Sequence, residues 1–257
     1  MFDLKIAGAL LYDGTGAPPR AADVGIRGDR IAKIGELSAA PARESLSAHG
    51  RCLCPGFIDV HTHSDQSVLR APEAPSRIFQ GVTTDVGGNC GDSAAPLNEE
   101  RALSAEADGE EVAYRWRSVA EFRACVERAR PAVNCALLIG HGTLRAGVLG
   151  YTNRRADPGD VRQMVAALER ALDEGGWGLS TGLIYSPGRY GDTDEIVARA
   201  RAAARRGGIY TSHLRSESAG LLEAVDEALE VGRRAGIRTQ ISHLKAAGRA
   251  NWPLMQP

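Results

Sequence analysis

In this 257-residue chain, several successive short apolar segments each end at a histidine or a cysteine. These residues are His61 with His63, Cys90, His213 and His243, and His141 is a weaker further case. The step from His61 to Cys90 is 29 residues, and the step from His213 to His243 is 30 residues. One strand–helix–strand repeat takes about 30 residues. The spacing therefore predicts polar groups at the carboxyl ends of successive strands, which in a (β/α)₈ barrel share one mouth where the chemistry occurs.

Strands and helices alternate from residue 55 onward. In the best helix, Met164, Leu168 and Leu172 share one face, after an Asp157-Pro158 start and before a Gly175-Gly176 end. The stretch from 92 to 130 is expected to be a helical insertion at the barrel mouth. We predict strands at 56–61, 81–86, 134–140, 178–183, 208–213 and 238–243, and helices at 158–174, 193–206 and 218–235.

Residues 1–54 differ from the rest, with short alternating runs and turn signals such as Asp13-Gly14 and Pro18-Pro19. This pattern predicts a small, sandwich-like β module without helices. The runs are 4–7, 10–12, 23–26 and 30–34.

The second predicted domain, residues 55–257, has room for six β/α strands. A closed eight-stranded barrel takes about 250 residues, and only 203 follow residue 54. The predicted fold class is therefore α/β, a TIM-like (β/α)₈ barrel that is incomplete at its C-terminus. Strands seven and eight are expected to be missing.

Composition narrows the function classes. The chain has 31 Lys and Arg against 32 Asp and Glu, which argues against a nucleic-acid or polybasic membrane surface. No apolar stretch reaches the 18 or so residues of a membrane span. The five cysteines form no even framework, and the first residues, which lack a basic stretch before an apolar one, lead us to expect no signal peptide. We expect a cytoplasmic protein with free thiols. The sequence does not predict an oligomeric state.

The histidines and Cys90 fit a metal site. In a strand, residues i and i+2 point to the same face, so His61 and His63 can reach one ion. Cys90 follows two glycines, and a thiolate is a strong zinc ligand that can bridge two ions. His213 and His243 stand in near-duplicate Ser-His-Leu-basic strings. These five residues are the predicted ligands.

Other histidines and cysteines are expected to be structural. We predict that His141 orients a loop or a substrate at the barrel mouth and that His49 is solvated. The remaining cysteines are expected to be small buried side chains; they are Cys52, Cys54, Cys125 and Cys135.

These motifs resemble the amidohydrolase superfamily, and closely its N-acyl-D-amino-acid deacylases (D-aminoacylases). The resemblance implies a barrel of the metal-dependent-hydrolase type. Hydantoinase-like relatives bridge two metals with a modified lysine on strand four. The corresponding string here, residues 178–185, has no lysine, which favours the deacylase branch. The strings that carry the resemblance are residues 55–65, 81–91, 178–185, 211–217 and 241–252.

The resemblance also implies roles for single residues. Cys90, His213 and His243 would hold a tight Zn²⁺, and His61 and His63 would form a second, weaker metal position. Tyr185 and Lys245 would hold the carboxylate and carbonyl region of the substrate. Residues implied to orient the ligands and fix their tautomers are Asp65, Arg215 and Glu217.

The implied reaction is hydrolysis of an N-acyl-D-amino acid to a D-amino acid and a carboxylate by metal-activated water. The general base of the resembled family is an Asp after strand eight, which would lie beyond Pro257. Two alternatives stay open. The chain could be a truncated, non-catalytic fragment that binds zinc or misfolds, or it could belong to a cyclic-amide hydrolase of the hydantoinase or dihydropyrimidinase type.

Overall fold

The chain divides into two compact units, Met1–Phe57 and Ile58–Pro257. The computed structural model describes residues 1–97 and 116–256. Within these ranges, no helix combines the length and the apolar character that a bilayer crossing requires.

The first unit is a five-stranded sheet in the order β3-β2-β1-β4, with β5 also paired to β1. A small core of Leu11, Ala22 and Val24 holds it together. No helix occurs in residues 1–57, as the sequence predicted. The two runs expected at 4–7 and 10–12 belong to one strand, β1. Its pairing with β2 shifts register between Ile6 and Ala9, so the two runs alternate out of phase within a single strand. The strands are β1 Phe2–Leu11, β2 Arg20–Arg27, β3 Arg30–Gly35, β4 Ala42–Ser47 and β5 Cys52–Leu53.

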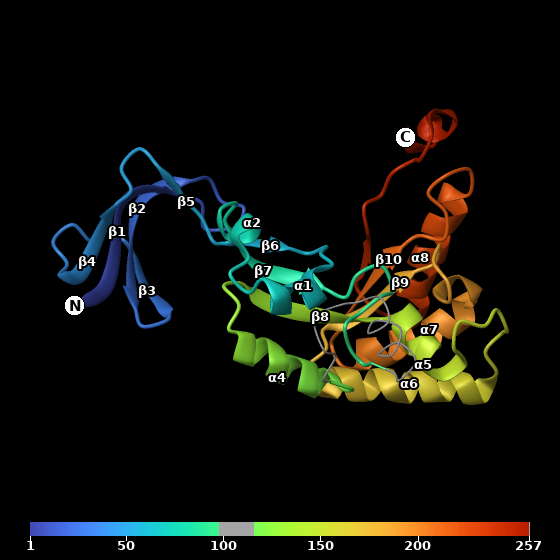
Figure 1. Cartoon of the computed structure of the whole chain (residues 1–257). Helices are drawn as coiled ribbons and strands as arrows, with labels where there is room; N and C mark the ends of the chain where they lie inside the picture. The colour runs from blue at the N-terminus through green and yellow to red at the C-terminus, as the bar shows by residue number, and fades with distance from the viewer. Residues whose placement is uncertain (98–115, 257) are drawn as a thin grey trace. The chain divides into compact units, whose positions relative to one another are not determined.

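The second unit is built on a six-stranded sheet whose spatial order follows the sequence, from β6 to β11. The pairs from β7 through β11 are parallel. This order, with helices between the strands, is that of an incomplete β/α barrel, and the predicted fold class is confirmed (Figure 1). The strands are β6 Phe57–Asp59, β7 Val82–Gly87, β8 Asn134–Gly140, β9 Gly178–Gly182, β10 Ile209–His213 and β11 Thr239–Ile241.

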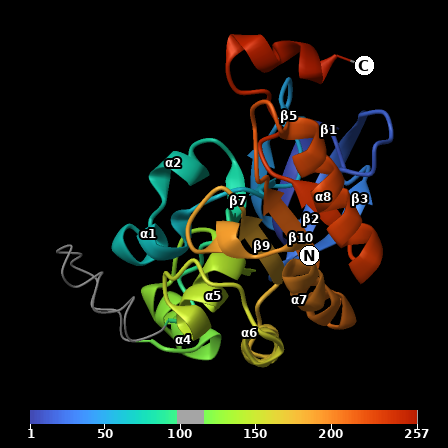
Figure 2. The ribbon, with the colours of Figure 1, turned by 90° about the vertical axis from the view of Figure 1, so that its right-hand side faces the viewer.

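Helices α6, α7 and α8 pack side by side along this sheet (Figure 2). Each buries its apolar stripe, and the resulting core includes Leu168, Ile196 and Val231. The predicted start of α6 is confirmed, because the Asp157 carboxylate accepts hydrogen bonds from the amides of Gly159 and Asp160. The helices are α1 Ser64–Arg70, α2 Pro75–Ile78, α4 Val119–Ala129, α5 His141–Leu149, α6 Pro158–Asp173, α7 Thr193–Arg205 and α8 Leu221–Ala235, with 3₁₀ turns η1 Gly188–Tyr190 and η2 Arg249–Met255.

Several expectations need correction. Strands β6 and β11 end two residues before His61 and His243, so these histidines lie in the turns that follow. Helix α5 was not predicted. Part of the expected helical insertion, residues 98–115, lies outside the described residues, and α4 forms its end. All five cysteines are free thiols as expected, but Cys52, Cys54 and Cys135 are exposed rather than buried. His49 is exposed, as predicted.

Candidate metal centre

Cys90 occupies the centre of a cluster of potential metal ligands. Its Sγ lies 3.4 Å from Nε2 of His61 and 3.6 Å from Nε2 of His243. Two donor sets share it, one with His61 and His63 and one with His213 and His243. Within each set the donor atoms lie within 4.8 Å of one another. All five predicted ligands therefore converge at the carboxyl ends of the strands.

Backbone geometry brings the cluster together. Cys90 and His243 have φ values of 54° and 34°, and they are two of four non-glycine residues with positive φ in the described residues. Such conformations are uncommon and concentrate at functional sites. The turn that carries His61 and His63 is anchored by Thr62, whose amide and hydroxyl both donate to the Val86 carbonyl at 3.1 Å.

Several imidazole nitrogens in the cluster have no hydrogen-bond partner. Both ring nitrogens of His213 and Nδ1 of His61 are buried without one. An unsatisfied buried polar group costs about 1–3 kcal/mol. Four imidazoles and a thiol that converge in this way match the nitrogen and sulfur ligands that zinc prefers. The donor set therefore fits a metal ion.

Burial sets the protonation of these groups. Burial and, to a smaller extent, the neighbouring His243 lower the pKa of His213 to about 4, and burial also lowers the pKa of His61. Both rings are thus neutral at pH 7, which is the form that binds metals. Burial, together with the Glu217 carboxylate, raises the pKa of the Cys90 thiol to about 11. A bound cation would deprotonate it.

Glu217 links the cluster to Lys245. Its Oε1 lies 2.9 Å from Nδ1 of His243, 2.5 Å from Nζ of Lys245 and 3.7 Å from Nε2 of His213. Although burial acts to raise the pKa of Glu217, the hydrogen bond from Lys245 and the nearby imidazoles lower it. When Nδ1 of His243 carries the proton and donates to Glu217, Nε2 is free to face Cys90.

Tyr185 and Lys245, the predicted substrate-binding residues, lie beside the donor atoms. The Tyr185 ring is 52% exposed and meets His213 edge-on, with ring centroids 4.8 Å apart. Nζ of Lys245 lies 3.3 Å from Nδ1 of His243. Both side chains can thus reach a small molecule above the cluster.

Comparison with known proteins identifies the family. The model described as Amidohydrolase family matches residues 44–250. The chain belongs to the amidohydrolase family. It is 43% identical over 254 residues to the N-acyl-D-glutamate deacylase of Alcaligenes xylosoxydans xylosoxydans, a match that covers 97% of this chain and 51% of the relative. The chain spans about half the length of the curated relatives it matches.

Two solved structures of amidohydrolases match 98% of the chain and 53% of their own length. One is the N-acyl-D-glutamate deacylase from Bordetella bronchiseptica in complex with zinc and a phosphonate inhibitor, with a TM-score of 0.91 and 41% identity. The other is a D-aminoacylase with a binuclear metal centre, characterised by one-metal activation and second-metal attenuation, with a TM-score of 0.91 and 39% identity. The resemblance stated from the motifs is confirmed.

Two residues of this amidohydrolase have contacts other than those expected. Asp65 was expected to orient a ligand, but its Oδ2 accepts a hydrogen bond from the Ala94 amide at 2.7 Å and so holds the segment after Cys90. Arg215 pairs with Glu227 at 2.8 Å and donates to the carbonyls of Arg189 and Gly191 at 2.8 and 3.0 Å. Both side chains support loops, and within the described part of the chain neither has a hydrogen bond to an imidazole.

His141 is completely buried, which favours the loop over the substrate among the two expected roles. Burial holds its pKa well below the usual value. Nδ1 accepts from Arg199 at 2.7 Å, which leaves Nε2–H to donate to the Gly188 carbonyl at 3.2 Å. The loop part of the expectation is therefore supported.

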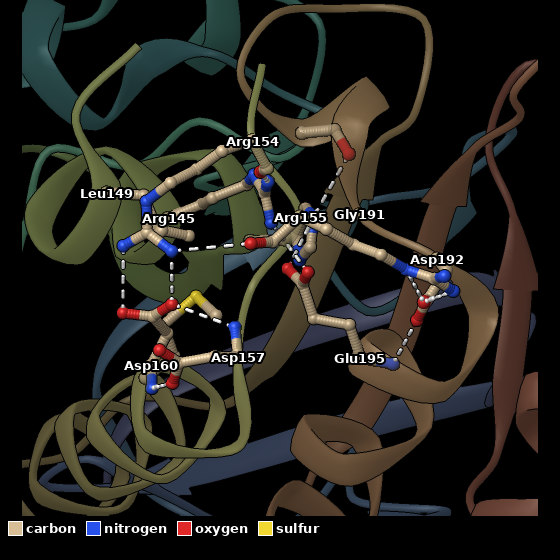
Figure 3. A network of polar contacts seen from close by, with 12 residues as sticks. Arg145, Leu149, Arg154, Arg155, Asp157, Asp160, Gly191, Asp192 and Glu195 are labelled. Atoms are coloured by element: carbon tan, nitrogen blue, oxygen red, sulfur yellow. Dashed lines mark hydrogen bonds and ion pairs between the residues drawn. The ribbon is translucent and has the colours of Figure 1, made fainter. Parts of the chain in front are cut away.

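A buried ion network that the motifs did not reveal surrounds His141. Glu195 accepts from Arg145 at 2.6 Å and from Arg199 at 2.8 Å. Figure 3 shows Arg145 reaching Glu195, and its second nitrogen donates to the Arg154 carbonyl at 2.6 Å. The sequence does contain one signal for this network. Glu195 and Arg199 are four residues apart, so these two opposite charges lie together on the apolar face of one helix.

Proposed function

We propose that Cys90, His213 and His243 bind one zinc ion tightly, and that His61 and His63 form a second, weaker position with Cys90. The observation that carries this proposal is the place of Cys90 in both donor sets. The unpartnered nitrogens of His213 and His61 support it. So do two relatives, one in complex with zinc and one with a binuclear metal centre.

The proposed reaction is hydrolysis of the amide bond of an N-acyl-D-amino acid to a D-amino acid and a carboxylate. The relatives support this substrate class and its D configuration, since they are an N-acyl-D-glutamate deacylase and a D-aminoacylase. Bound zinc would supply a Lewis acid and a nucleophile at neutral pH. The chain's own residues would bind and orient the substrate.

Lys245 and Tyr185 are the proposed substrate-binding residues. The Lys245 ammonium has three donors and is half exposed, so it can bind a carboxylate while it stays paired with Glu217. The exposed Tyr185 ring lies over His213 and can contact the acyl region. No lysine lies in β9, Gly178–Gly182, so Cys90 would be the residue that both metal positions share, which favours linear over cyclic amides.

The test is an assay of the chain loaded with one equivalent of zinc. The substrates are N-acetyl-D-glutamate, N-acetyl-D-methionine, their L enantiomers, hydantoin and dihydrouracil. We expect zinc-dependent release of D-amino acids only. Turnover of the cyclic amides without the acyl amino acids would contradict the proposal. Full zinc loading without any turnover would limit the function of these 257 residues to metal binding.

A further inference from the structure

Three residues of the turn that carries Cys90 have a left-handed backbone. Gly88 and Gly91 flank it with φ values of 72° and 77°, and Cys90 itself has a φ of 54°. A cysteine in this region is strained unless its surroundings hold it there. The turn must therefore be held by contacts outside itself.

Ser180 on β9 provides such contacts. Its side chain is completely buried, and its Oγ donates to the Gly88 carbonyl and accepts from the Gly91 amide at 3.1 Å. One hydroxyl thus closes both ends of the turn. Its donor and one acceptor position are both used, so the turn and the strand are hydrogen-bonded without water.

Backbone packing brings the turn against β9. A Cβ at Gly182 would lie 1.8 Å from the Cys90 carbonyl oxygen, and a Cβ at Gly91 would lie 2.4 Å from the Gly182 nitrogen. Only glycines allow this approach. From the other side, Nδ2 of the Asn89 side chain donates to the Val86 carbonyl at 2.9 Å. The turn is therefore fixed between β7 and β9.

We propose that Ser180 is a positioning residue that holds Cys90 in its left-handed conformation and aims Sγ between His61 and His243 before a metal binds. The proposal rests on the zinc function proposed above. Without the hydroxyl, the Gly88 carbonyl and the Gly91 amide lose their buried partner, and the turn can relax toward the more common backbone region. The thiolate would then leave the point that both donor sets share.

The neighbouring Thr181 offers a matched control. It is on the same strand and is also completely buried. Its hydroxyl contacts Tyr210 and Ser212, both at 3.0 Å, and not the Cys90 turn. Thr181→Val therefore removes one buried hydroxyl from β9 and leaves the turn untouched, whereas Ser180→Ala removes the proposed clamp.

The experiment has two readouts on the 257-residue chain. Amide hydrogen exchange of Gly91, resolved by NMR, should become about fivefold faster in metal-free Ser180→Ala, since one hydrogen bond is worth about 1 kcal/mol. Cobalt(II) titration should show the thiolate-to-cobalt absorption band with an affinity lower by about 10–100-fold, as for other residues that orient metal ligands. Thr181→Val should match the unchanged chain in both.

The outcomes separate this inference from the zinc proposal. A thiolate–cobalt band that is unchanged in Ser180→Ala would overturn the inference and leave the zinc site intact. No such band in the unchanged chain would overturn both. If Ser180→Ala does not fold, hydrogen exchange in the unchanged chain tests the inference. The Gly91 amide must then be equally protected from exchange with and without metal. Protection only in the metal-bound form would show that the turn is not preformed.

Discussion

The two donor sets share Cys90 but differ in how their histidines are held. His213 is the last residue of β10 and is buried, and Nδ1 of His243 lies 2.9 Å from the Glu217 carboxylate. His63, by contrast, is exposed at the start of α1, and Nδ1 of His61 has no partner. No carboxylate in the described residues orients either of the latter rings.

This difference indicates how a single thiolate can serve two unequal metal positions. A carboxylate that holds a histidine fixes the ring tautomer and raises its basicity, which strengthens metal binding. The set with His213 and His243 has this support, and the set with His61 and His63 does not. We therefore expect the first zinc ion at the former.

Replacing Cys90 should have the largest effect, because both donor sets depend on it. Cys90→Ala should lower zinc affinity by at least about 100-fold and remove zinc from the dialysed chain, as measured by elemental mass spectrometry. Cys135→Ala is the control, since Cys135 is an exposed cysteine outside both sets. Stoichiometric zinc in Cys90→Ala would refute the shared-thiolate model.

Single histidine replacements should separate the two positions. His213→Ala should lose the one tightly bound zinc, since only Cys90 and His243 would remain in that set. His63→Ala should keep it and lose only the second, weaker ion. Zinc titration monitored with a competing chelator measures both. If His63→Ala loses the tightly bound zinc and His213→Ala keeps it, the tight ion is bound at His61 and His63.

Glu217→Gln should weaken the tight position by about 10–100-fold, because the amide cannot replace the charge beside His243 and Lys245. Glu227→Gln is the matched control. Both carboxylates have side chains 14% exposed, but Glu227 pairs with Arg215. Equal zinc affinities in the two variants would mean that Glu217 does not support the ligand.

The smallest expected effect is on stability in acid. The pKa of His213, lowered to about 4 mainly by burial, lies below the value near 6.5 expected in the unfolded chain. Between pH 6.5 and 4 the unfolded state binds more protons, so the free energy of unfolding falls as pH falls. His213→Asn should reduce this slope in urea titrations of the metal-free chain. A slope in His213→Asn identical to that of the unchanged chain would exclude His213 as a contributor.

Sequence reasoning succeeded where the signal is local or periodic. The helix from Pro158 and the strand Asn134–Gly140 follow from apolar spacing, caps and glycines. The convergence of the five predicted ligands followed from their place after strands. The clamp by Ser180 was not predictable, because it joins residues 89 to 92 positions apart in the chain. The roles of Asp65 and Arg215 were likewise set by tertiary contacts.

The most direct test of the shared Cys90 is X-ray absorption spectroscopy at the zinc edge on the chain loaded with one equivalent of zinc. We predict one sulfur ligand at about 2.3 Å beside nitrogen ligands at about 2.0–2.1 Å, and loss of the sulfur signal in Cys90→Ala. A first shell of nitrogen and oxygen alone in the unchanged chain would contradict the account.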